Sequence, residues 1–429
     1  MTVASSSTLA LHGGTPVIAT PFRRYNPIGK EERDAAVRVI DSGVLSQFLG
    51  AWGPDFLGGP EVQAFERECE AYFGVRHAVT VNSWTSGLVA AVGALNLELG
   101  DEVITTPWTM SATATAVLHW NAIPVFADIE PRTFCLDPAS VEANITPYTK
   151  AIVSADIFGH SANTEALMAI AAKHGLKVIS DTAQAPGATR NGKYAGTLTD
   201  IGGYSLNYHK HIHTGEGGIL VTDDEELATR LRLIRNHAEV VVGGMGRTNL
   251  VNMVGHNFRL GEIECAMGRE QLKKLASKVA SRQHAAARLT AGLADLPGLR
   301  LPVVEPGNTH VYYVYPMIVD TVALGVPKTR IVEALRAEGV EGVSPAYQNI
   351  HLIPMYQQKI AFGSQGFPWT APFCRRDVDY RKGICPVAEE LQDTSYIGFA
   401  ACVHQLDDAD VDLLIEAFRK VWAAMETLR

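Results

Sequence analysis

Short runs of hydrophobic and β-branched residues recur along the chain from about residue 77, and amphipathic stretches separate them. Apolar runs of strand length that alternate with helical patterns are typical of βαβ units and of a mainly parallel sheet. The pattern therefore predicts an α/β protein. The expected strands cover residues 78–82, 102–106, 123–128, 151–157, 177–180, 202–206 and 218–222.

Helix signals lie between and after these strands. Asp137 precedes Pro138, which places an N-cap residue before a first-turn proline, and residues 222–225 have the spacing of a capping box. A long helical stretch covers residues 261–293. The final helix is predicted from apolar residues at i, i+3, i+4 and i+7 spacing, which form a core-facing stripe: Val411, Leu414, Ile415, Phe418, Val421, Trp422 and Met425.

A change of composition after the long helical stretch marks a domain boundary. Proline and glycine interrupt the chain repeatedly over residues 297–307, and a strand over 311–319 and a helix over 327–338 follow. The small set of elements beyond the boundary predicts a second α/β domain. We expect an N-terminal arm (residues 1–30), a large domain (31–295) and a small C-terminal domain (296–429).

Composition excludes several classes of protein. The chain has 429 residues, of which 47% are hydrophobic and 19% are charged, as is usual for folded globular proteins rather than disordered or fibrous ones. A net charge of -9 without a basic run argues against a nucleic-acid partner. The 6 cysteines include no C-x-x-C pair, which fits neither a disulfide framework nor a zinc ribbon and suits a reducing compartment.

No segment is expected to enter or cross a membrane. The N-terminus carries no basic residue before its short apolar patch and does not resemble a signal sequence. Residues 103–127 contain no Asp, Glu, Lys or Arg, but Pro107 and Pro124 interrupt them. A buried strand, helix and strand in succession explain this stretch. A cytoplasmic location is therefore the expectation.

Three polar segments follow predicted strands, where ligands of parallel sheets bind. Residues 82–88 end a strand with small hydroxyl side chains and start a helix, which suits either a bound phosphate or a simple N-cap. Asp181 ends an apolar strand, where it either stabilises a protonated ring nitrogen of a cofactor or caps the next helix. Lys210 directly follows a strand in a loop rich in Gly, His and Thr. A nucleophilic amine that forms a Schiff base explains this lysine better than a solvated surface charge does.

The same loop offers a metal site as a rival hypothesis. His209, His211 and His213 alternate along the sequence, as metal ligands on a strand do. No neighbouring carboxylate or cysteine completes a ligand set, and Lys210 between two of the histidines would repel a cation. We therefore expect no metal. Glu216, in a glycine-rich turn, is expected to brace the loop.

Together these segments resemble a known family. The spacing from Ser205 through Lys210 to the Gly-Glu-Gly-Gly turn, preceded by Asp181 and Gln184, resembles the DegT/StrS family of sugar aminotransferases that depend on pyridoxal 5'-phosphate (PLP). Supporting similarity occurs in residues 9–16, 255–260 and 385–389. The resemblance implies the aspartate-aminotransferase-like fold type I, in which a large PLP-binding domain has a mainly parallel sheet and a smaller α/β domain follows.

The resemblance also assigns roles to the catalytic candidates. It implies that Lys210 carries the cofactor as an internal aldimine and that Asp181 pairs with the pyridinium nitrogen, so that the ring remains an electron sink. Gln184 would contact the polar edge of the ring. Lys210 would then move the proton in both halves of a ping-pong transamination.

A second group is implied to hold the cofactor phosphate. The group comprises Thr85 with the backbone at Trp84, Ser205, and Asn257 reaching across from a second subunit. The last role implies a homodimer with sites shared across the interface. Asn207 is a secondary candidate.

Two positions depart from the family pattern. The family usually has glycine at the position of Trp84, so this side chain is expected either to point away from the phosphate or to shape the substrate pocket. Met110 stands where an aromatic ring usually stacks on PLP, and a thioether also packs on a ring face. Trp108 is the alternative stacking residue.

The implied reaction moves an amino group from L-glutamate or L-glutamine to a keto sugar (nucleotide-linked, phosphorylated or free) or to a keto cyclitol. The opening Gly13-Gly14 segment is similar to that of family members that aminate cyclitols in antibiotic synthesis. Relatives that dehydrate deoxy sugars carry histidine in place of the lysine, so Lys210 favours transamination over a dehydratase, which is the alternative. A non-catalytic or metal-binding protein on the same fold is a further alternative. Visible absorption by an aldimine would distinguish the aminotransferase from a metal-binding protein on the same fold.

Aromatic and basic clusters are candidates for the acceptor pocket. Aromatic residues gather in the proline-rich 345–372 loop and around residues 312–315, where core packing explains them equally well. A nucleotide-linked acceptor would need cations for its diphosphate. The nearest basic cluster is Arg375, Arg376, Arg381 and Lys382.

Overall fold

The computed structural model describes residues 8–429 and has a large sheet of 7 strands in the order β1-β9-β8-β5-β4-β2-β3. β9 is antiparallel to both of its neighbours, whereas all the other pairs are parallel. The predicted mainly parallel sheet is confirmed. Its strands are β1 (His77–Val81), β2 (Glu102–Thr105), β3 (Ile123–Phe126), β4 (Thr149–Ala155), β5 (Lys177–Asp181), β8 (Ile201–Ser205) and β9 (Gly218–Thr222).

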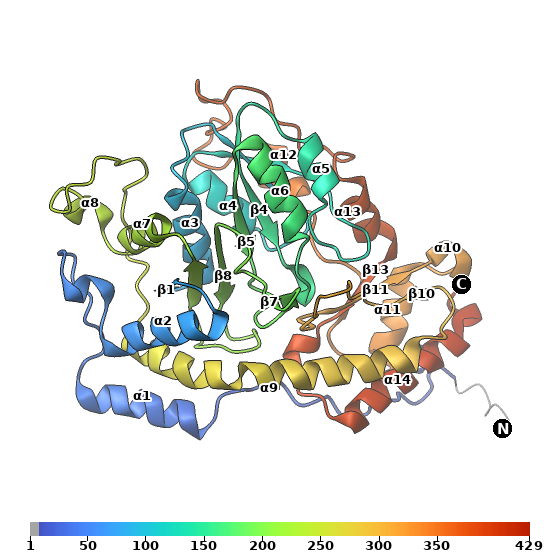
Figure 1. The fold of residues 1–429 in the computed structure, drawn as a ribbon. Helices are drawn as coiled ribbons and strands as arrows, with labels where there is room; N and C mark the ends of the chain where they lie inside the picture. Colours follow the sequence, from blue (N-terminus) through green and yellow to red (C-terminus); the bar gives the residue numbers. More distant parts are fainter. Residues whose placement is uncertain (1–7) are drawn as a thin grey trace.

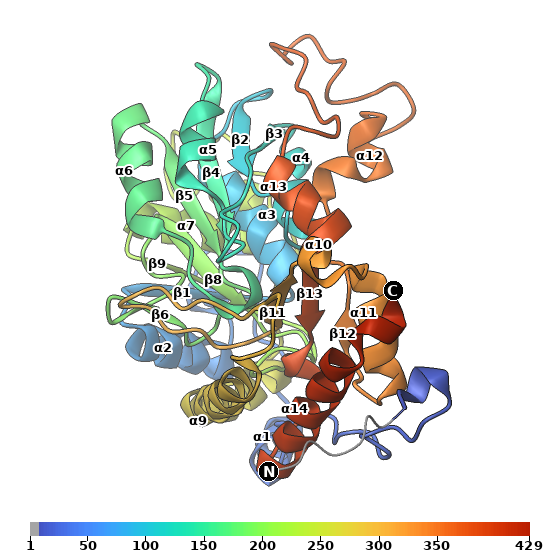
Figure 2. The ribbon, with the colours of Figure 1, turned by 90° about the vertical axis from the view of Figure 1, so that its right-hand side faces the viewer.

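Helices cover both faces of this sheet (Figures 1 and 2). One face packs against α3, α4 and α7, and the other packs against α5, α6 and the pair α2 and α9. Each strand is buried along nearly its whole length because both faces are covered. These helices are α2 (Pro60–Phe73), α3 (Trp84–Ala94), α4 (Ala112–His119), α5 (Pro138–Ala143), α6 (Thr164–His174) and α7 (Glu225–Arg235).

Local capping sets where the helices begin. Asp137 accepts hydrogen bonds from the N–H groups of Ala139 and Ser140, as its position before Pro138 predicts. The expected capping box over residues 222–225 does not form at the start of α7. The N-cap is Asp224, whose side chain accepts hydrogen bonds from the N–H groups of Glu226 and Leu227. The uncharged stretch 103–127 forms β2, α4 and β3, as expected.

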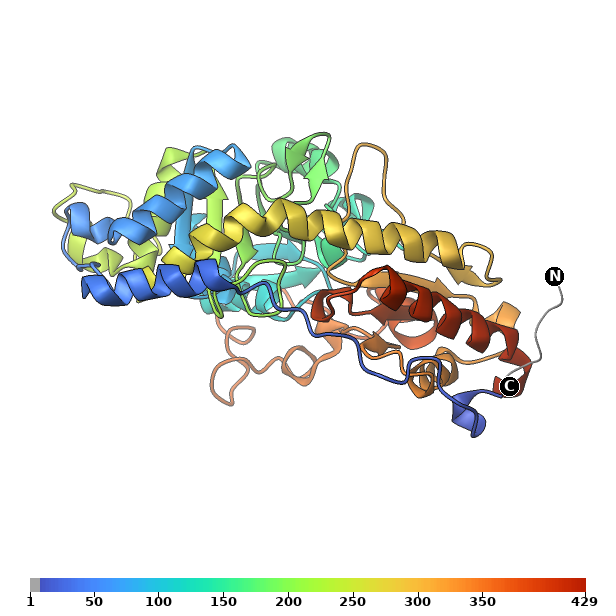
Figure 3. The ribbon, with the colours of Figure 1, turned by 90° about the horizontal axis from the view of Figure 1, so that it is seen from below.

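A long helix, α9 (Glu262–Leu293), runs beneath the 7-stranded sheet and on toward a smaller sheet of 4 strands (Figure 1). α1 (Lys30–Ser42) and α14 (Asp408–Ala423) lie beside opposite halves of it (Figure 3). The predicted apolar stripe of α14 is buried at Val411, Leu414, Phe418, Val421 and Trp422.

The smaller sheet lies at the far end of α9. Its strands are antiparallel in the order β10-β11-β13-β12, and α11 (Lys328–Ala337) and α14 share its core. The strand and the helix predicted beyond residue 311 are therefore confirmed. The strands are β10 (Leu299–Arg300), β11 (Tyr315–Val319), β12 (Val343–Ser344) and β13 (Tyr396–Phe399).

The segment between β12 and β13 packs against the edge of the large sheet. Ile350, Tyr356 and Tyr380 share a hydrophobic core with Ile123 and Phe126 of the large sheet's edge strand β3. The segment is mostly irregular, as the proline-rich sequence predicts. Shorter elements of the chain are β6 (Thr189–Arg190), β7 (Lys193–Tyr194), α8 (Ala238–Val241), α10 (Thr321–Leu324), α12 (Pro354–Gln357) and α13 (Pro386–Glu390).

Within residues 8–429, every helix is either too short or too polar to cross a bilayer.

Candidate active site

A cavity of about 270 Å³ lies at the carboxyl ends of β4, β5 and β8, beside the start of α3. We call it the site cavity. Ligands of parallel α/β sheets bind at this edge, because the strand ends present their loops there. The cavity brings together most of the residues singled out in the sequence: Trp84, Thr85, Met110, Asp181, Gln184, Ser205, Asn207 and Lys210.

Lys210 presents its amine to the site cavity from the loop that follows β8. The residue is only 7% exposed, and Nζ lies 4.3 Å from the ring centre of Tyr313. Within residues 8–429, no carboxylate forms an ion pair with this amine. Burial lowers the pKa of Lys210 to about 8, and Cys402 and Asp181 partly oppose the shift. About a tenth of the amine is therefore uncharged at pH 7, far more than for an exposed lysine, and the uncharged amine is the form that acts as a nucleophile.

The loop that carries Lys210 is braced at both ends. The Nδ2 group of Asn207 donates to Oε1 of Glu216 over 2.8 Å, as expected of the glutamate. The N–H of Lys210 donates to the carbonyl of Asn207 over 2.9 Å, and that of Leu206 donates to the carbonyl of Gly217 over 2.9 Å. These contacts hold the lysine backbone in place and leave its amine free.

Asp181 ends β5 with a buried carboxylate whose two oxygens both accept hydrogen bonds. Nε1 of Trp84 donates to Oδ1 over 2.6 Å, and the hydroxyl of Thr113 donates to Oδ2 over 2.7 Å. The N–H of Ala183 donates to Oδ1 over 3.2 Å. These hydrogen bonds fix the orientation of the carboxylate toward the cavity. A carboxylate oriented in this way suits a protonated ring nitrogen.

Two glycines, Gly87 and Gly203, leave the space that the indole of Trp84 occupies when it contacts Asp181. A Cβ atom on Gly203 would lie 2.3 Å from the indole ring, and a Cβ atom on Gly87 would lie 2.8 Å from it. Side chains at these positions would push the indole out of its place. The sequence alone did not indicate the contact with Asp181, because the two glycines belong to different elements.

Gln184 is fixed at both ends of its amide. Oε1 accepts from the N–H of Phe158 over 2.9 Å, and Nε2 donates to the hydroxyl of Tyr347 over 3.0 Å. Tyr347 comes from the segment that follows β12. Burial raises the pKa of its hydroxyl to about 12, so Tyr347 remains a neutral hydrogen-bonding group.

The start of α3 has free donors beside the cavity. Ser83 caps the helix by accepting from the N–H of Ser86, whereas the N–H groups of Trp84 and Thr85 have no acceptor in the described part of the chain. The hydroxyl of Ser205 lines the same cavity. Helix N-termini with neighbouring hydroxyls bind phosphates.

A model of the DegT/DnrJ/EryC1/StrS aminotransferase family matches residues 48–386. The chain belongs to this family. It is 36% identical over 428 residues to an L-glutamine:2-deoxy-scyllo-inosose aminotransferase of Streptoalloteichus tenebrarius, covering 96% of this chain and 97% of that protein. It is 33% identical over 406 residues to the spore coat polysaccharide biosynthesis protein SpsC of Bacillus subtilis, covering 92% and 95%. The X-ray structure of the aminotransferase from Psychrobacter cryohalolentis matches with a TM-score of 0.80 at 28% identity, covering 95% of this chain and 100% of that one.

Membership makes the protein a PLP-dependent aminotransferase. The residues around the site cavity fit that cofactor. Lys210 supplies an amine for the aldehyde, Asp181 an oriented anion for the ring nitrogen, and the start of α3 free N–H groups for the phosphate.

Asn257 lies apart from the site cavity of its own chain. Its side chain is exposed, and its Oδ1 accepts from Nε of Arg259 over 2.7 Å. It does not line the cavity with the other predicted phosphate ligands. Asn257 could therefore contact a cofactor phosphate only in the site cavity of another subunit.

The two candidates for ring stacking differ in position. Met110 lines the cavity and is 62% exposed. Trp108 is fully buried outside the lining, and its ring stacks on Tyr347 with centres 6.2 Å apart. The geometry favours Met110 as the residue that faces the cofactor.

The three alternating histidines face different neighbours. His209 lies against the ring of Tyr313, and burial together with the Lys210 charge lowers its pKa to about 4. The ring of His211 contacts the carbonyl of Val311 over 2.8 Å, and His213 accepts from the backbone of its own turn. The imidazoles do not converge on one point.

One acidic group at the cavity was missed by sequence reasoning. Asp156 directly follows β4, as Asp181 ends β5, so its position at the end of a strand was an available signal. It accepts from the hydroxyl of Thr182 over 2.6 Å, and burial raises its pKa to about 6. Tyr313, one of the aromatic candidates around residues 312–315, also lines the cavity.

The basic cluster predicted for a diphosphate is used elsewhere. Each of its members is paired with a carboxylate, and none of them lines the site cavity. The cluster named for a nucleotide-linked acceptor therefore does not serve the site cavity of its own chain, because the fold supplies its counter-charges. The pairs are Arg375 with Asp101, Arg376 with Glu102, Arg381 with Asp379, and Lys382 with Asp393.

Proposed function

We propose that this aminotransferase moves the amino group of L-glutamine to a keto cyclitol by ping-pong transamination. The observation that carries the proposal is the site cavity, where the amine of Lys210 and the anchored carboxylate of Asp181 face the same space. The resemblance to an L-glutamine:2-deoxy-scyllo-inosose aminotransferase over almost the whole of both chains supports this donor and acceptor.

Lys210 and Asp181 have different roles in the proposed reaction. Bound PLP supplies an aldehyde and an electron-withdrawing ring. Lys210 would hold the cofactor through its amine, and the same amine, when free, would accept and return a proton at the substrate Cα. Asp181 would face the ring nitrogen of PLP, and the ring would delocalise negative charge that develops on the substrate. Because the pKa of Lys210 is lowered to about 8, the amine can both accept and return that proton near neutral pH.

The walls of the cavity suit an uncharged polyol better than a nucleotide diphosphate. Hydroxyls and amides of Thr109, Gln184, Asn207, Tyr313 and Tyr347 surround it. Lys210 is the sole Lys or Arg among its described lining residues, and the proposal uses that lysine for catalysis. Hydroxyl groups of a cyclitol would find donors and acceptors here, whereas a diphosphate would lack a cation.

The exposed position of Asn257 leads us to propose a homodimer. Large apolar side chains are exposed on the α1 side and on the segment before Asn257, where a partner would cover them: Ile40, Leu45, Leu49, Trp52, Val240, Leu250 and Val254. An Asn257 side chain that crosses this interface would add a donor to the phosphate end of the partner's site cavity.

The acceptor is tested by competition. Purified enzyme loaded with PLP is incubated with L-glutamine and equal amounts of 2-deoxy-scyllo-inosose and a dTDP-linked keto sugar, and amino products are separated by mass. We expect the aminocyclitol to dominate by about 100-fold. Preferential amination of the dTDP-sugar would overturn the acceptor proposal. L-Glutamate in place of L-glutamine tests the donor, and Lys210→Ala is the control without product.

A further inference from the structure

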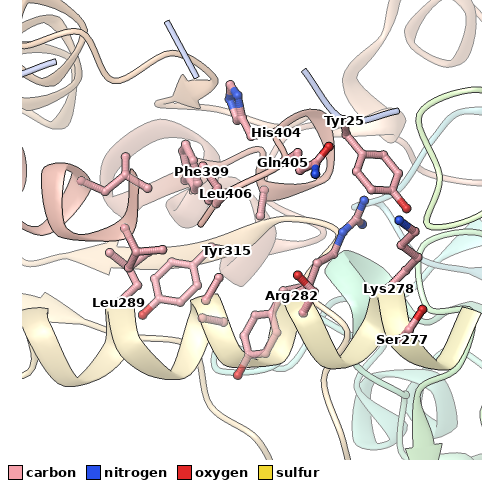
Figure 4. A pocket seen from close by; sticks show the side chains of 17 residues that line it. Tyr25, Ser277, Lys278, Arg282, Leu289, Tyr315, Phe399, His404, Gln405 and Leu406 are labelled. Atoms are coloured by element: carbon pink, nitrogen blue, oxygen red, sulfur yellow. The ribbon is translucent and has the colours of Figure 1, made fainter. Parts of the chain in front are cut away.

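A second cavity, of about 300 Å³, lies between α9, α14 and the N-terminal arm (Figure 4). We call it the α9 cavity. It shares no lining residue with the site cavity. Figure 4 shows Arg282 and Lys278 extending from α9 toward the ring of Tyr25, with Leu289 and Tyr315 at the opposite end. One end is therefore cationic and the other apolar.

Arg282 is buried without a counter-charge. The residue is 8% exposed, and no Asp or Glu is among the described residues that line the α9 cavity. Its Nη2 donates to the carbonyl of Cys402 over 3.2 Å, whereas Nε and Nη1 are buried and have no partner within residues 8–429. Buried charges are normally paired, and buried N–H groups normally have acceptors.

The ring of Tyr25 offsets only part of this imbalance. The guanidinium carbon of Arg282 lies 4.5 Å from the ring centre, and Nζ of Lys278 lies 5.9 Å from it. A ring face attracts a cation but accepts no directed hydrogen bond of the strength that a carboxylate oxygen provides. The charge of Arg282 therefore remains without an anionic partner among the described residues that line the cavity.

The rest of the lining determines which chemical group, apart from the carboxylate, the cavity can hold. Beyond the two cations, the polar lining residues are Ser277, Ser281, His404 and Gln405. Most of the cavity walls are apolar and include Ala285, Leu289, Phe399, Leu406 and Leu414, together with tyrosine rings. A phosphate or a small polar acid would leave these walls uncovered. A flat or branched apolar group attached to a carboxylate would fill them and place its charge at Arg282.

We propose that the α9 cavity binds an organic carboxylate with an apolar body, held by Arg282 and Lys278. This site is separate from transamination and does not depend on the identity of the acceptor sugar. The carboxylate would lie beside the guanidinium charge of Arg282 and accept a hydrogen bond from the ammonium of Lys278. The apolar body would lie along α9 toward Leu289.

Sodium benzoate is the probe, titrated calorimetrically into the PLP-loaded enzyme, with neutral benzamide as its uncharged counterpart. We expect saturable benzoate binding, at least about tenfold tighter than benzamide binding, and a loss of about tenfold or more in Arg282→Gln. Arg288→Gln is the matched control on the same helix, because Arg288 is exposed and paired with Asp412. It should bind benzoate as the wild type does.

Further variants keep the test decisive if Arg282→Gln fails to fold. Lys278→Gln, at the half-buried rim, should weaken benzoate binding, and Ala285→Leu should weaken it by filling the cavity. Binding by the wild type that these variants leave unchanged would overturn the proposal, as would the absence of benzoate binding. Loss of binding in Lys210→Ala, or in the presence of L-glutamine, would also overturn it, because the probe would then occupy the site cavity.

Discussion

The indole nitrogen of Trp84 donates a hydrogen bond to Oδ1 of Asp181 over 2.6 Å, and thereby joins the start of α3 to the end of β5. Trp84 stands at a position where the family pattern has glycine. A residue that departs from the pattern thus contacts the carboxylate on which the cofactor ring depends. Since Thr113 donates to the other oxygen, both oxygens of the carboxylate are held by neutral donors.

Trp84→Phe removes this donor and keeps an aromatic ring. We expect the affinity for PLP to fall roughly 10- to 100-fold, which corresponds to the loss of about 1.5–3 kcal/mol for a buried hydrogen bond to a charged group. The fall in affinity is measured by titrating cofactor-free protein with PLP and following visible absorbance.

Trp120→Phe is the matched control. Trp120 is also buried, but its Nε1 donates to the carbonyl of Val89, away from Asp181. Nuclear magnetic resonance gives a second observable, because the indole N–H signal that disappears in Trp84→Phe should shift in Asp181→Asn. An indole signal indifferent to Asp181→Asn, or equal PLP affinity in the two tryptophan variants, would refute the role.

Asp156 should make the stability of the cofactor-free protein depend on pH. Burial raises its pKa from 3.8 to about 6, so the folded protein binds this proton more tightly than the unfolded chain does. The resulting stabilisation is complete below pH 4 and is lost as pH rises to about 6. Asp156→Asn removes this titration. The free energy of unfolding of Asp156→Asn, measured relative to that of the wild type, should therefore rise by about 2 kcal/mol between pH 4 and pH 7.

Urea unfolding of both proteins at several pH values measures the difference. Asp41→Asn, a substitution of an exposed acid on α1, serves as the control. A difference between Asp156→Asn and the wild type that stays constant across pH 4–7 would contradict the expected titration.

The local pattern of the sequence predicted the strands and the positions of Asp181 and Lys210 well. Both residues follow apolar runs that become β5 and β8, and the end of a parallel strand is a position that sequence specifies over a few residues. The cap at Asp137 is equally local. Local signals of this kind do not depend on the tertiary arrangement.

Contacts between distant segments could not be predicted. Trp84 reaches Asp181 only because Gly203, on another strand, leaves room for the indole. Arg376 looked available for a ligand until the fold paired it with Glu102, which lies 274 positions away in the sequence. Such pairings depend on packing across the molecule, which hydrophobic periodicity does not encode.

Shared sites in a homodimer can be tested by mixing two defective variants. Lys210→Ala lacks the amine, and Asn257→Asp places a negative charge at the proposed phosphate end of the partner's cavity. We expect each variant alone to be nearly inactive. Mixed dimers would contain one site with both native residues, so refolding an equal mixture should restore up to roughly 25% of wild-type activity.

Sedimentation of the mixture establishes whether dimers form. Activity of Asn257→Asp equal to that of the wild type, or dimers whose mixture stays as inactive as its components, would contradict sites completed across the interface.

The central claim, that the amine of Lys210 bonds to PLP and serves transamination, is tested most directly by visible absorption spectra. Purified wild type and Lys210→Ala are each supplied with PLP and recorded before and after addition of L-glutamine. We expect a visible absorption band in the wild type that L-glutamine bleaches. Lys210→Ala should show neither this band nor its bleaching. A wild-type spectrum identical to that of free PLP, or a donor response unchanged in Lys210→Ala, would contradict the central claim.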